Sequence, residues 1–441
     1  MLTQFVPPDV VGAAIVGRTR DRARREGPLS MHFAVYYELA LALFPDQSYE
    51  DVAADLTGAI PELAVVVPAK SALLGARRRL GPEAMRAVFE RVAAPAAAAG
   101  TVGAFWRGMR TLAVDGFAVE VPDSRDNRGY FGGPSTRLGD GEVMDCGYPQ
   151  ARVVALVETG TRAVLGAGVG TYHDGEQPLA LHLAGHVGPG DLVLFDRNFP
   201  AVALWQAFAG HGAALVMRAK KSIARTNVRP LADGSYLAEM WAGGRTGRRD
   251  VCHVTVRVIE YTTGGEMIRL ITSLTSPEEY PARQVAALYA ERWQCEVGNL
   301  QLKALQMRPG ATLRSRCPDQ VRQEIFAHLT LNHALTRLTT LIADERGEDP
   351  ERVSFTQVLK QVRRSVVRQL ARTAAQAADA AHAIAADLRR YRNPPRGPRT
   401  SERRIKRLRH RFPLRRPAPR GTPVTTPAPP TTITLLPTPT S

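Results

Sequence analysis

The sequence is poor in cysteine and has no long apolar run. Its four cysteines (Cys146, Cys252, Cys295 and Cys317) are scattered over 441 residues, and none lies in a C-x-x-C pair. This number and spacing argue against a disulfide framework and against a zinc site, and they suit a reducing cytoplasm. Neither a signal-peptide pattern nor an apolar run of membrane-spanning length is present. We therefore expect no membrane partner.

Lysine is also scarce, yet the chain is strongly basic. Only six of its 58 basic residues are lysines, and the net charge is +16. Arginine keeps its charge at any working pH, and its planar guanidinium binds phosphate through two N–H donors at once. The excess therefore favours a polyanionic partner, with nucleic acid as the first candidate. A solubility effect or a coding bias towards arginine explains the charge equally well, so charge alone does not decide.

The first 98 residues are predicted to form an all-α domain. Apolar residues with helical spacing fill 29–44, and S-Y-E-D at 48–51 is a capping box for a helix over 48–56. Pro68 is expected to open a further helix that ends in basic residues. Two short helices and a turn of this kind resemble a helix-turn-helix, and the alternative is a helical bundle with a solvated basic face. The candidate DNA-binding residues are Lys70, Arg77, Arg78 and Arg79.

From residue 99 to about 345 the pattern is α/β, and we expect a catalytic domain. Strands are predicted over 111–121, 151–157, 163–169, 191–195 and 213–217, with helices over 176–186 and 200–211. Three strands, then helix, strand, helix and strand, is the order of a ribonuclease-H-like core. A β-rich insertion is expected over about 220–275, because T-T-G-G-E joins two strand-like runs there as a hairpin signal.

The C-terminal quarter is predicted to be helical and then disordered. Helices are expected over 281–305, 318–341 and 354–391, so that 346–392 forms a C-terminal helical segment. The tail at 393–441 is first basic and then rich in proline and threonine. Such a composition cannot bury enough apolar surface to offset its ordering entropy, although its basic half is suited to holding phosphates.

Two aspartates interrupt or end apolar strands. Asp115 lies in T-L-A-V-D-G, and Asp196 ends the run L-V-L-F-D. A carboxylate in a core strand is costly unless it is paired or bound to metal, and α/β sites lie at the carboxyl ends of strands. Taken singly, each aspartate also fits the alternative of an ordinary acid at the end of a strand that faces solvent. Asp123, Asp126 and Asp191 compete with them, but the first two lie in a polar segment expected to be a loop and the third begins its strand.

A third acid lies on the predicted helix over 281–305. In Y-A-E-R-W-Q-C-E-V-G-N-L-Q-L-K, the residues Tyr289, Arg292, Glu296 and Lys303 fall on one stripe of an α-helix. Glu296 can hold a metal ion, while the other three can hold phosphate oxygens. The alternative is an Arg292–Glu296 pair on a wet helix surface, stabilising by only a few tenths of a kcal/mol.

The spacing of these four residues resembles the Tyr-Arg-Glu-Lys signature of bacterial transposases of the insertion-sequence-four type. The segments L-A-V-D-G, P-D-S-R-D-N and D-L-V-L-F-D-R-N-F also resemble that family, and the likeness covers about 5–345. It implies a ribonuclease-H-like fold with a β insertion. It further implies an Asp-Asp-Glu triad of Asp115, Asp196 and Glu296 that holds two Mg²⁺ or Mn²⁺ ions, with Asp115 contacting both. Tyr289, Arg292 and Lys303 would then position DNA phosphates.

The resemblance also implies cut-and-paste DNA transposition. The protein would bind terminal inverted repeats of double-stranded DNA through residues 1–98 and the insertion. Water would hydrolyse the transposon end, and the freed 3′-hydroxyl would attack target DNA. We expect a homodimer in a synaptic complex, acting in a bacterial cytoplasm at the nucleoid. The alternatives are a retired transposase that only binds repeat DNA, and a nuclease of the same fold without strand transfer.

Overall fold

The computed structural model describes most of the chain. The described residues are 2–18, 29–57, 67–137, 143–220, 226–241, 253–263, 265–307, 312–367, 374–388, 391–394, 402–403, 424–425 and 434–435. Contacts divide the chain into two compact units. Unit 1 comprises Met1–Met217 and Arg292–Asn393, and unit 2 comprises Arg218–Glu291 and Pro394–Ser441. The predicted disordered tail lies almost wholly outside the described residues.

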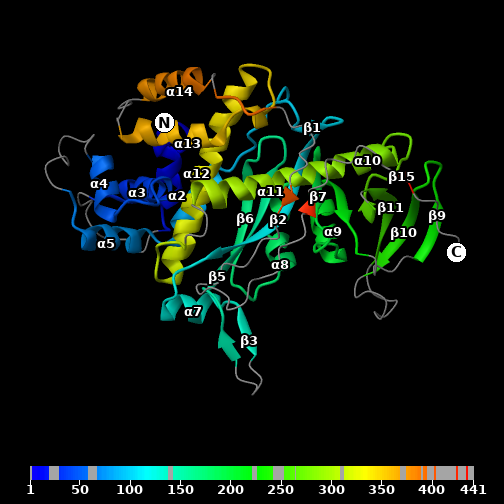
Figure 1. Ribbon diagram of the computed structural model, residues 1–441, viewed down its shortest axis with the longest axis horizontal. Helices are drawn as coiled ribbons and strands as arrows, with labels where there is room; N and C mark the ends of the chain where they lie inside the picture. Colours follow the sequence, from blue (N-terminus) through cyan, green and yellow to red (C-terminus); the bar gives the residue numbers. More distant parts are fainter. Residues whose placement is uncertain are drawn as a thin grey trace. The chain divides into compact units, whose positions relative to one another are not determined.

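The core of unit 1 is a five-stranded sheet. In spatial order its strands are β6 (Val164–Gly170), β5 (Gln150–Glu158), β2 (Met109–Glu120), β7 (Asp191–Phe195) and β8 (Ala214–Arg218). β5 pairs antiparallel with both β2 and β6, whereas β7 pairs parallel with both β2 and β8. A central first strand with a meander on one side and two parallel strands on the other is the ribonuclease-H-like arrangement (Figure 1). The predicted fold class is confirmed.

The parallel strands are reached through short helices. α8 (Glu176–Leu181) and a 3₁₀ turn, η1 (Ala184–His186), lead into β7, and α9 (Val202–Gly210) leads into β8. The interiors of β7 and β8 are almost wholly buried, as expected for strands covered on both faces. β1 (Phe105–Trp106) pairs with the first residues of β2.

In the described parts of residues 2–98, six helices precede the sheet. They are α1 (Leu2–Phe5), α2 (Pro8–Ile15), α3 (Met31–Leu43), α4 (Tyr49–Thr57), α5 (Lys70–Leu80) and α6 (Pro82–Val92). The predicted capping box is confirmed, with Asp51 in the acidic position: the Ser48 hydroxyl accepts the Asp51 N–H at 3.1 Å, and Asp51 accepts the Ser48 N–H. α5 begins at Lys70 and not at Pro68, because Ala69 is still extended with ψ 148°.

A long helix, α12 (Pro318–Asp344), runs through unit 1 and is buried over most of its length. It packs against α3 and α6 of the N-terminal region, against β6 of the sheet and against α13 (Phe355–Val367). η5 (Pro350–Arg352) and α14 (Ala374–Leu388) complete the unit. The single helix predicted over 354–391 is therefore two helices. No described helix is long and apolar enough to cross a membrane.

The prediction of a loop over the polar segment with Asp123 and Asp126 is correct for Asp123 and wrong for Asp126. Residues Arg125–Phe131 form α7, whose N-terminus is capped by Ser124 accepting the Asn127 N–H at 3.2 Å. Distant contacts stabilise this short helix, because Asn127 also donates to the Ser315 carbonyl at 3.0 Å. A small hairpin of β3 (Ser135–Arg137) and β4 (Val143–Asp145) follows.

Unit 2 contains the β-rich insertion, which is confirmed. Its antiparallel strands are β9 (Thr226–Pro230), β10 (Tyr236–Trp241), β11 (His253–Thr263) and β12 (Glu266–Thr272), in that spatial order. The predicted hairpin joins β11 to β12 through Gly265, whose φ of 78° explains the glycine. Arg257 is fully buried and ion-paired with Asp233, which also accepts the Ala282 N–H and so anchors α10 (Ala282–Tyr289).

Candidate active site

Asp115 and Asp196 lie beside each other because β2 and β7 are parallel. Val114 is the register partner of Phe195, so each aspartate is the next residue along its own strand. Side chains at equivalent positions of paired strands project from the same face of the sheet. Asp115 and Asp196 are both partly buried. The parallel register therefore gives Asp115, within β2, and Asp196, directly after β7, neighbouring positions in the sheet.

The segment with the signature residues is helical, but it is not one uniform α-helix. α10 ends at Tyr289, a 3₁₀ turn, η3, spans Ala290–Arg292, α11 spans Trp293–Leu300, and a π-helical segment, η4, spans Gln301–Gln306. The predicted helix over 281–305 is confirmed as a helical segment, but its 3₁₀ and π parts mean that it is not one uniform α-helix. Tightening and then widening the helix changes the rotation per residue, so a stripe drawn at constant rotation is not preserved.

The helical segment of α11 and η4 runs along β2, and three contacts show this. The Cys295 sulfur lies 4.0 Å from the Ala113 carbonyl oxygen, and Asn299 donates to Asp115 Oδ2 at 2.9 Å. The Lys303 ammonium then lies 5.7 Å from the centre of the Phe117 ring. Four helical residues rise about 6 Å and two strand residues about 7 Å, so the steps match. The helix thus runs alongside β2 on the face that carries Asp115.

Negative charge is concentrated around Asp115. Burial raises the pKa of the Asp115 carboxyl to about 6, and the neighbouring Glu296 and Asp196 carboxylates raise it as well. Arg292 and the Gly116 N–H act in the opposite direction. Arg292 donates to Glu296 at 2.6 Å, so the Arg292–Glu296 ion pair of the alternative interpretation is present. It lies partly buried beside Asp115, and not on an open surface as that alternative supposed.

The three carboxylates fit a divalent metal by their chemistry. Magnesium and manganese prefer oxygen ligands, and a cation would relieve the crowding of negative charge that raises the Asp115 pKa. Within the described part of the chain, no three acidic, histidine or cysteine side chains already converge closely enough to enclose an ion. Glu296 is held by Arg292, so its carboxylate would have to turn towards the aspartates to become a ligand.

Asn299 is a site residue that the sequence interpretation missed. Its side chain is only 9% exposed, and its amide donates to the carboxylate of Asp115. The available signal was its position three residues after Glu296, since residues at that spacing are neighbours on a helix. The sequence interpretation considered the acids and bases of the signature and did not consider this neutral amide.

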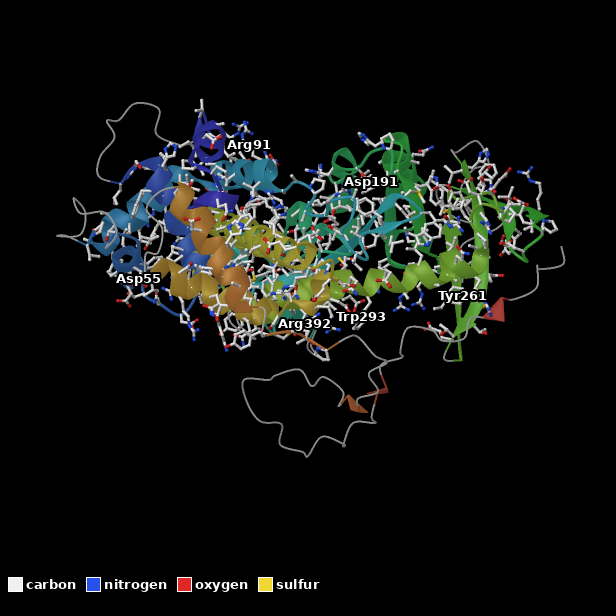
Figure 2. All side chains as sticks on the ribbon, turned by 90° about the horizontal axis from the view of Figure 1, so that it is seen from above. Asp55, Arg91, Asp191, Tyr261, Trp293 and Arg392 are labelled. Carbon is white, nitrogen blue, oxygen red and sulfur yellow. The ribbon has the colours of Figure 1, made fainter. Side chains whose placement is uncertain are left out.

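The other signature residues differ in exposure. Lys303 is exposed and Arg292 is 15% exposed, so the first of these lies open to a phosphate group. Tyr289 is the last residue of α10 and belongs to unit 2, where its side chain is 7% exposed. Trp293, the first residue of α11, is 40% exposed (Figure 2).

The candidate DNA-binding residues on α5 also differ in their exposure to solvent. Lys70 and Arg78 are exposed, and Arg79 is partly exposed. Arg77 is fully buried, with its Nε 2.5 Å from Glu38 Oε1. The prediction that Arg77 presents its charge to DNA is therefore wrong. On a helix that packs against α3, the basic run turns one of its arginines inwards.

The competing aspartates have local structural partners. Asp123 pairs with Arg128 at 2.8 Å, and Asp191 accepts the Gly188 N–H at 2.9 Å. Asp126 is exposed in the first turn of α7, where a negative charge is favourable. Contacts therefore account for Asp123 and Asp191, and the position at the start of α7 accounts for Asp126.

Comparisons with known proteins find transposases along most of the chain. The model of the transposase DDE domain matches residues 106–332, and the model of the insertion element 4 transposase N-terminal region matches residues 1–90. The chain is 28% identical over 375 residues to the transposase InsG for insertion sequence element IS4 of Escherichia coli strain K12, covering 83% of this chain and 82% of that protein.

Two further similarities are more limited. The putative transposase InsZ of Escherichia coli strain K12 is 29% identical over 131 residues, which is 30% of this chain and 42% of that protein. The cryo-EM structure of the piggyBac transposase synaptic complex with hairpin DNA is 11% identical, with a TM-score of 0.43 over 91% of this chain and 86% of that chain. The DDE domain alone covers more than half of this sequence. The chain therefore belongs to the DDE transposases of the insertion element 4 family, and it is a DNA transposase that cleaves DNA and transfers strands.

Proposed function

We propose that Asp115, Asp196 and Glu296 form the metal-holding triad with which this transposase cuts transposon ends and joins them to target DNA. The observation that carries the proposal is the parallel register of β2 and β7, which sets the two aspartates side by side. α11 supports it, because Asn299 on that helix bonds to Asp115 and Glu296 acts on the same carboxyl.

DDE transposases use divalent metal ions, and we propose two Mg²⁺ or Mn²⁺ ions here. When bound, they would neutralise developing charge and activate water or a 3′-hydroxyl. Asp115, as the central acid, would contact both ions, while Asp196 and Glu296 would serve one each. Asn299 holds one carboxylate oxygen of Asp115 and so limits its rotation.

We propose that Arg292 and Lys303 hold DNA phosphates next to the triad. Arg292 already bonds a carboxylate oxygen of Glu296, and a phosphate oxygen is the same kind of acceptor. Lys303 is exposed beside Phe117, two residues beyond Asp115 on the same strand face. Tyr289 is left out, because its side chain is 7% exposed.

The DNA itself enters the proposal as transposon ends and a target. Transposases bind DNA, and the exposed Lys70 and Arg78 and the partly exposed Arg79 on α5 are suited to phosphates of a terminal inverted repeat. The N-terminal region over 1–98 would carry most of this contact, and the β insertion the rest. Because two ends must be joined, we propose that two protomers act in one synaptic complex, at the bacterial nucleoid.

A joining assay tests the proposed function. The protein is incubated with end-repeat DNA, Mg²⁺ and a target plasmid, alongside Asp196→Ala. We expect joined products from the unsubstituted protein and none from Asp196→Ala, because the loss of a metal ligand removes several kcal/mol of charge stabilisation. Asp191→Ala, at the start of the same strand, is the matched control and should still join.

The products separate the alternatives. Cleavage without joining would identify a nuclease. DNA binding that Asp196→Ala leaves unchanged, with no cleavage by either protein, would identify a retired transposase that only binds repeats.

A further inference from the structure

The turn between β5 and β6 has an unusual backbone. Arg162 in this turn has φ 68°, and Arg107 is the other non-glycine residue with positive φ in the described ranges. For a side chain with a Cβ, this left-handed conformation is unfavourable. Arg162 is also buried, with 8% of its side chain exposed. A buried guanidinium on a strained backbone persists only where its surroundings hold it there.

Glu158 supplies much of that support. Its buried carboxylate accepts from Arg110 Nη1 at 2.6 Å, from the Ala97 N–H at 2.9 Å and from Thr161 Oγ1 at 2.5 Å. Its backbone carbonyl accepts the Arg162 N–H at 2.7 Å. Glu158, the last residue of β5, therefore fixes the turn through several hydrogen bonds. These bonds hold Arg162 in its unfavourable backbone conformation.

The Arg162 side chain reaches α11. Its Nε and Nη2 both donate to Gln294 Oε1, at 3.1 and 3.0 Å, and its Nη2 also lies 3.7 Å from Glu351. One turn along the helix, Gly298 passes directly over Arg162. A Cβ at Gly298 would lie 3.5 Å from Arg162 Cβ and 3.8 Å from its carbonyl oxygen.

These contacts determine the rotation of the helix. Gln294 and Gly298 are four residues apart and therefore share one side of α11, which rests on Arg162. The helix also contacts β2 through the Asn299–Asp115 bond. α11 has a 3₁₀ turn before it and a π-helical segment after it, so regular helical hydrogen bonding alone does not fix its rotation.

We propose that Arg162 is a positioning residue that clamps α11 through Gln294 and so keeps Glu296 on the side of the helix from which its carboxylate can turn to the two aspartates. The proposal rests on the proposed function of the triad. Glu296 lies between the two clamped positions in sequence. A small rotation of the helix about its axis would carry the Glu296 carboxylate away from Asp115 while leaving the fold intact.

The test compares two substitutions of Gln294 in the full-length protein. Gln294→Met removes the acceptor of both Arg162 N–H groups, and we expect it to slow single-turnover cleavage at saturating end DNA by roughly 10- to 100-fold. The Kd for end DNA should stay within about twofold, because the helix is misplaced and the DNA contacts are kept. Gln294→Glu keeps an oxygen acceptor, so it should restore cleavage to within a fewfold of the unsubstituted rate.

Backbone strain is separated from the clamp by a matched pair. Arg162→Gly and Arg107→Gly both relieve a positive φ, but only the first removes the bonds to Gln294. We expect slow cleavage from Arg162→Gly and normal cleavage from Arg107→Gly. In a double-substitution cycle, Arg162→Met should add little to Gln294→Met, since both remove the same contact.

The experiments distinguish a failure of the proposed clamp from a failure of the proposed triad. Normal cleavage by Gln294→Met, equal loss in Gln294→Glu and Gln294→Met, or fully additive effects with Arg162→Met would each overturn the clamp. Glu296→Gln is run in parallel. If Glu296→Gln cleaves normally, the proposed triad is wrong. If it is inactive while Gln294→Met is normal, only the clamp is wrong.

Discussion

Replacing Asp115 by asparagine should abolish cleavage and, in metal-free buffer above about pH 6, stabilise the folded protein. Burial, aided by the Glu296 and Asp196 carboxylates, raises the pKa of Asp115 from 3.8 to about 6. Below the lower of these values the carboxyl is protonated in both folded and unfolded chains, and no penalty arises. As the pH rises from 3.8 to about 6 the folded state loses stability, and above that the full penalty remains.

The expected gain in the free energy of unfolding for Asp115→Asn is at most about 3 kcal/mol near pH 8, and it should vanish near pH 4. Cleavage should fall by on the order of 1,000-fold or more, because the proposed shared metal ligand is gone. Denaturant unfolding in a chelating buffer at both pH values provides the measurement. Asp123→Asn, at an exposed acid, is the control. A variant that is less stable than the unsubstituted protein at both pH values would contradict this account of Asp115.

The second large effect is expected at Arg77. Its guanidinium is fully buried against Glu38, and it also donates to Tyr49 Oη at 2.9 Å and to Ser315 Oγ at 3.0 Å. Gln323 of α12 donates to the same glutamate. Arg77→Met would leave a buried carboxylate without its partner, which typically costs about 3–5 kcal/mol of stability.

Arg78 provides a matched control for this prediction, because it is the next residue and is exposed. Arg78→Met should change stability by no more than about 0.5 kcal/mol and should weaken binding to end DNA. The paired variant Arg77→Met with Glu38→Met should recover part of the loss caused by Arg77→Met alone, since no unpaired charge remains. If Arg77→Met folds with normal stability and loses DNA affinity, Arg77 is a DNA contact after all.

Arg77 also shows where sequence interpretation stops. A basic run at a helix end looks the same whether its members face solvent or the core. The partner that decides the matter, Glu38, lies 39 residues earlier, on another helix. Similarly, α7 was not expected, because its stabilising contact is with the carbonyl of Ser315, 188 residues away from Asn127. Long-range contacts of this kind leave no local pattern.

Strands whose signal is local were predicted well. The bounds of β7 match the prediction, because an apolar run between polar residues has few alternatives. The two aspartates were placed at strand positions for the same reason, but only the parallel register brings them together. The helix with Glu296 was predicted as helical, but its 3₁₀ and π segments and its contacts with β2 and Arg162 were not predicted. Asn299 and Arg162 gained their importance from those contacts, and neither belongs to a charged motif at the expected spacing.

We propose that carboxylate oxygens of Asp115, Asp196 and Glu296 hold the metal ions of the reaction. The most direct test is cleavage of end DNA by Asp196→Cys in Mg²⁺ and in Mn²⁺. A thiolate is a poor ligand for the hard Mg²⁺ ion and a better one for Mn²⁺. We expect Asp196→Cys to show no cleavage with Mg²⁺ and measurable recovery with Mn²⁺. Equal activity with the two ions, whether lost or retained, would show that residue 196 does not hold a metal ion.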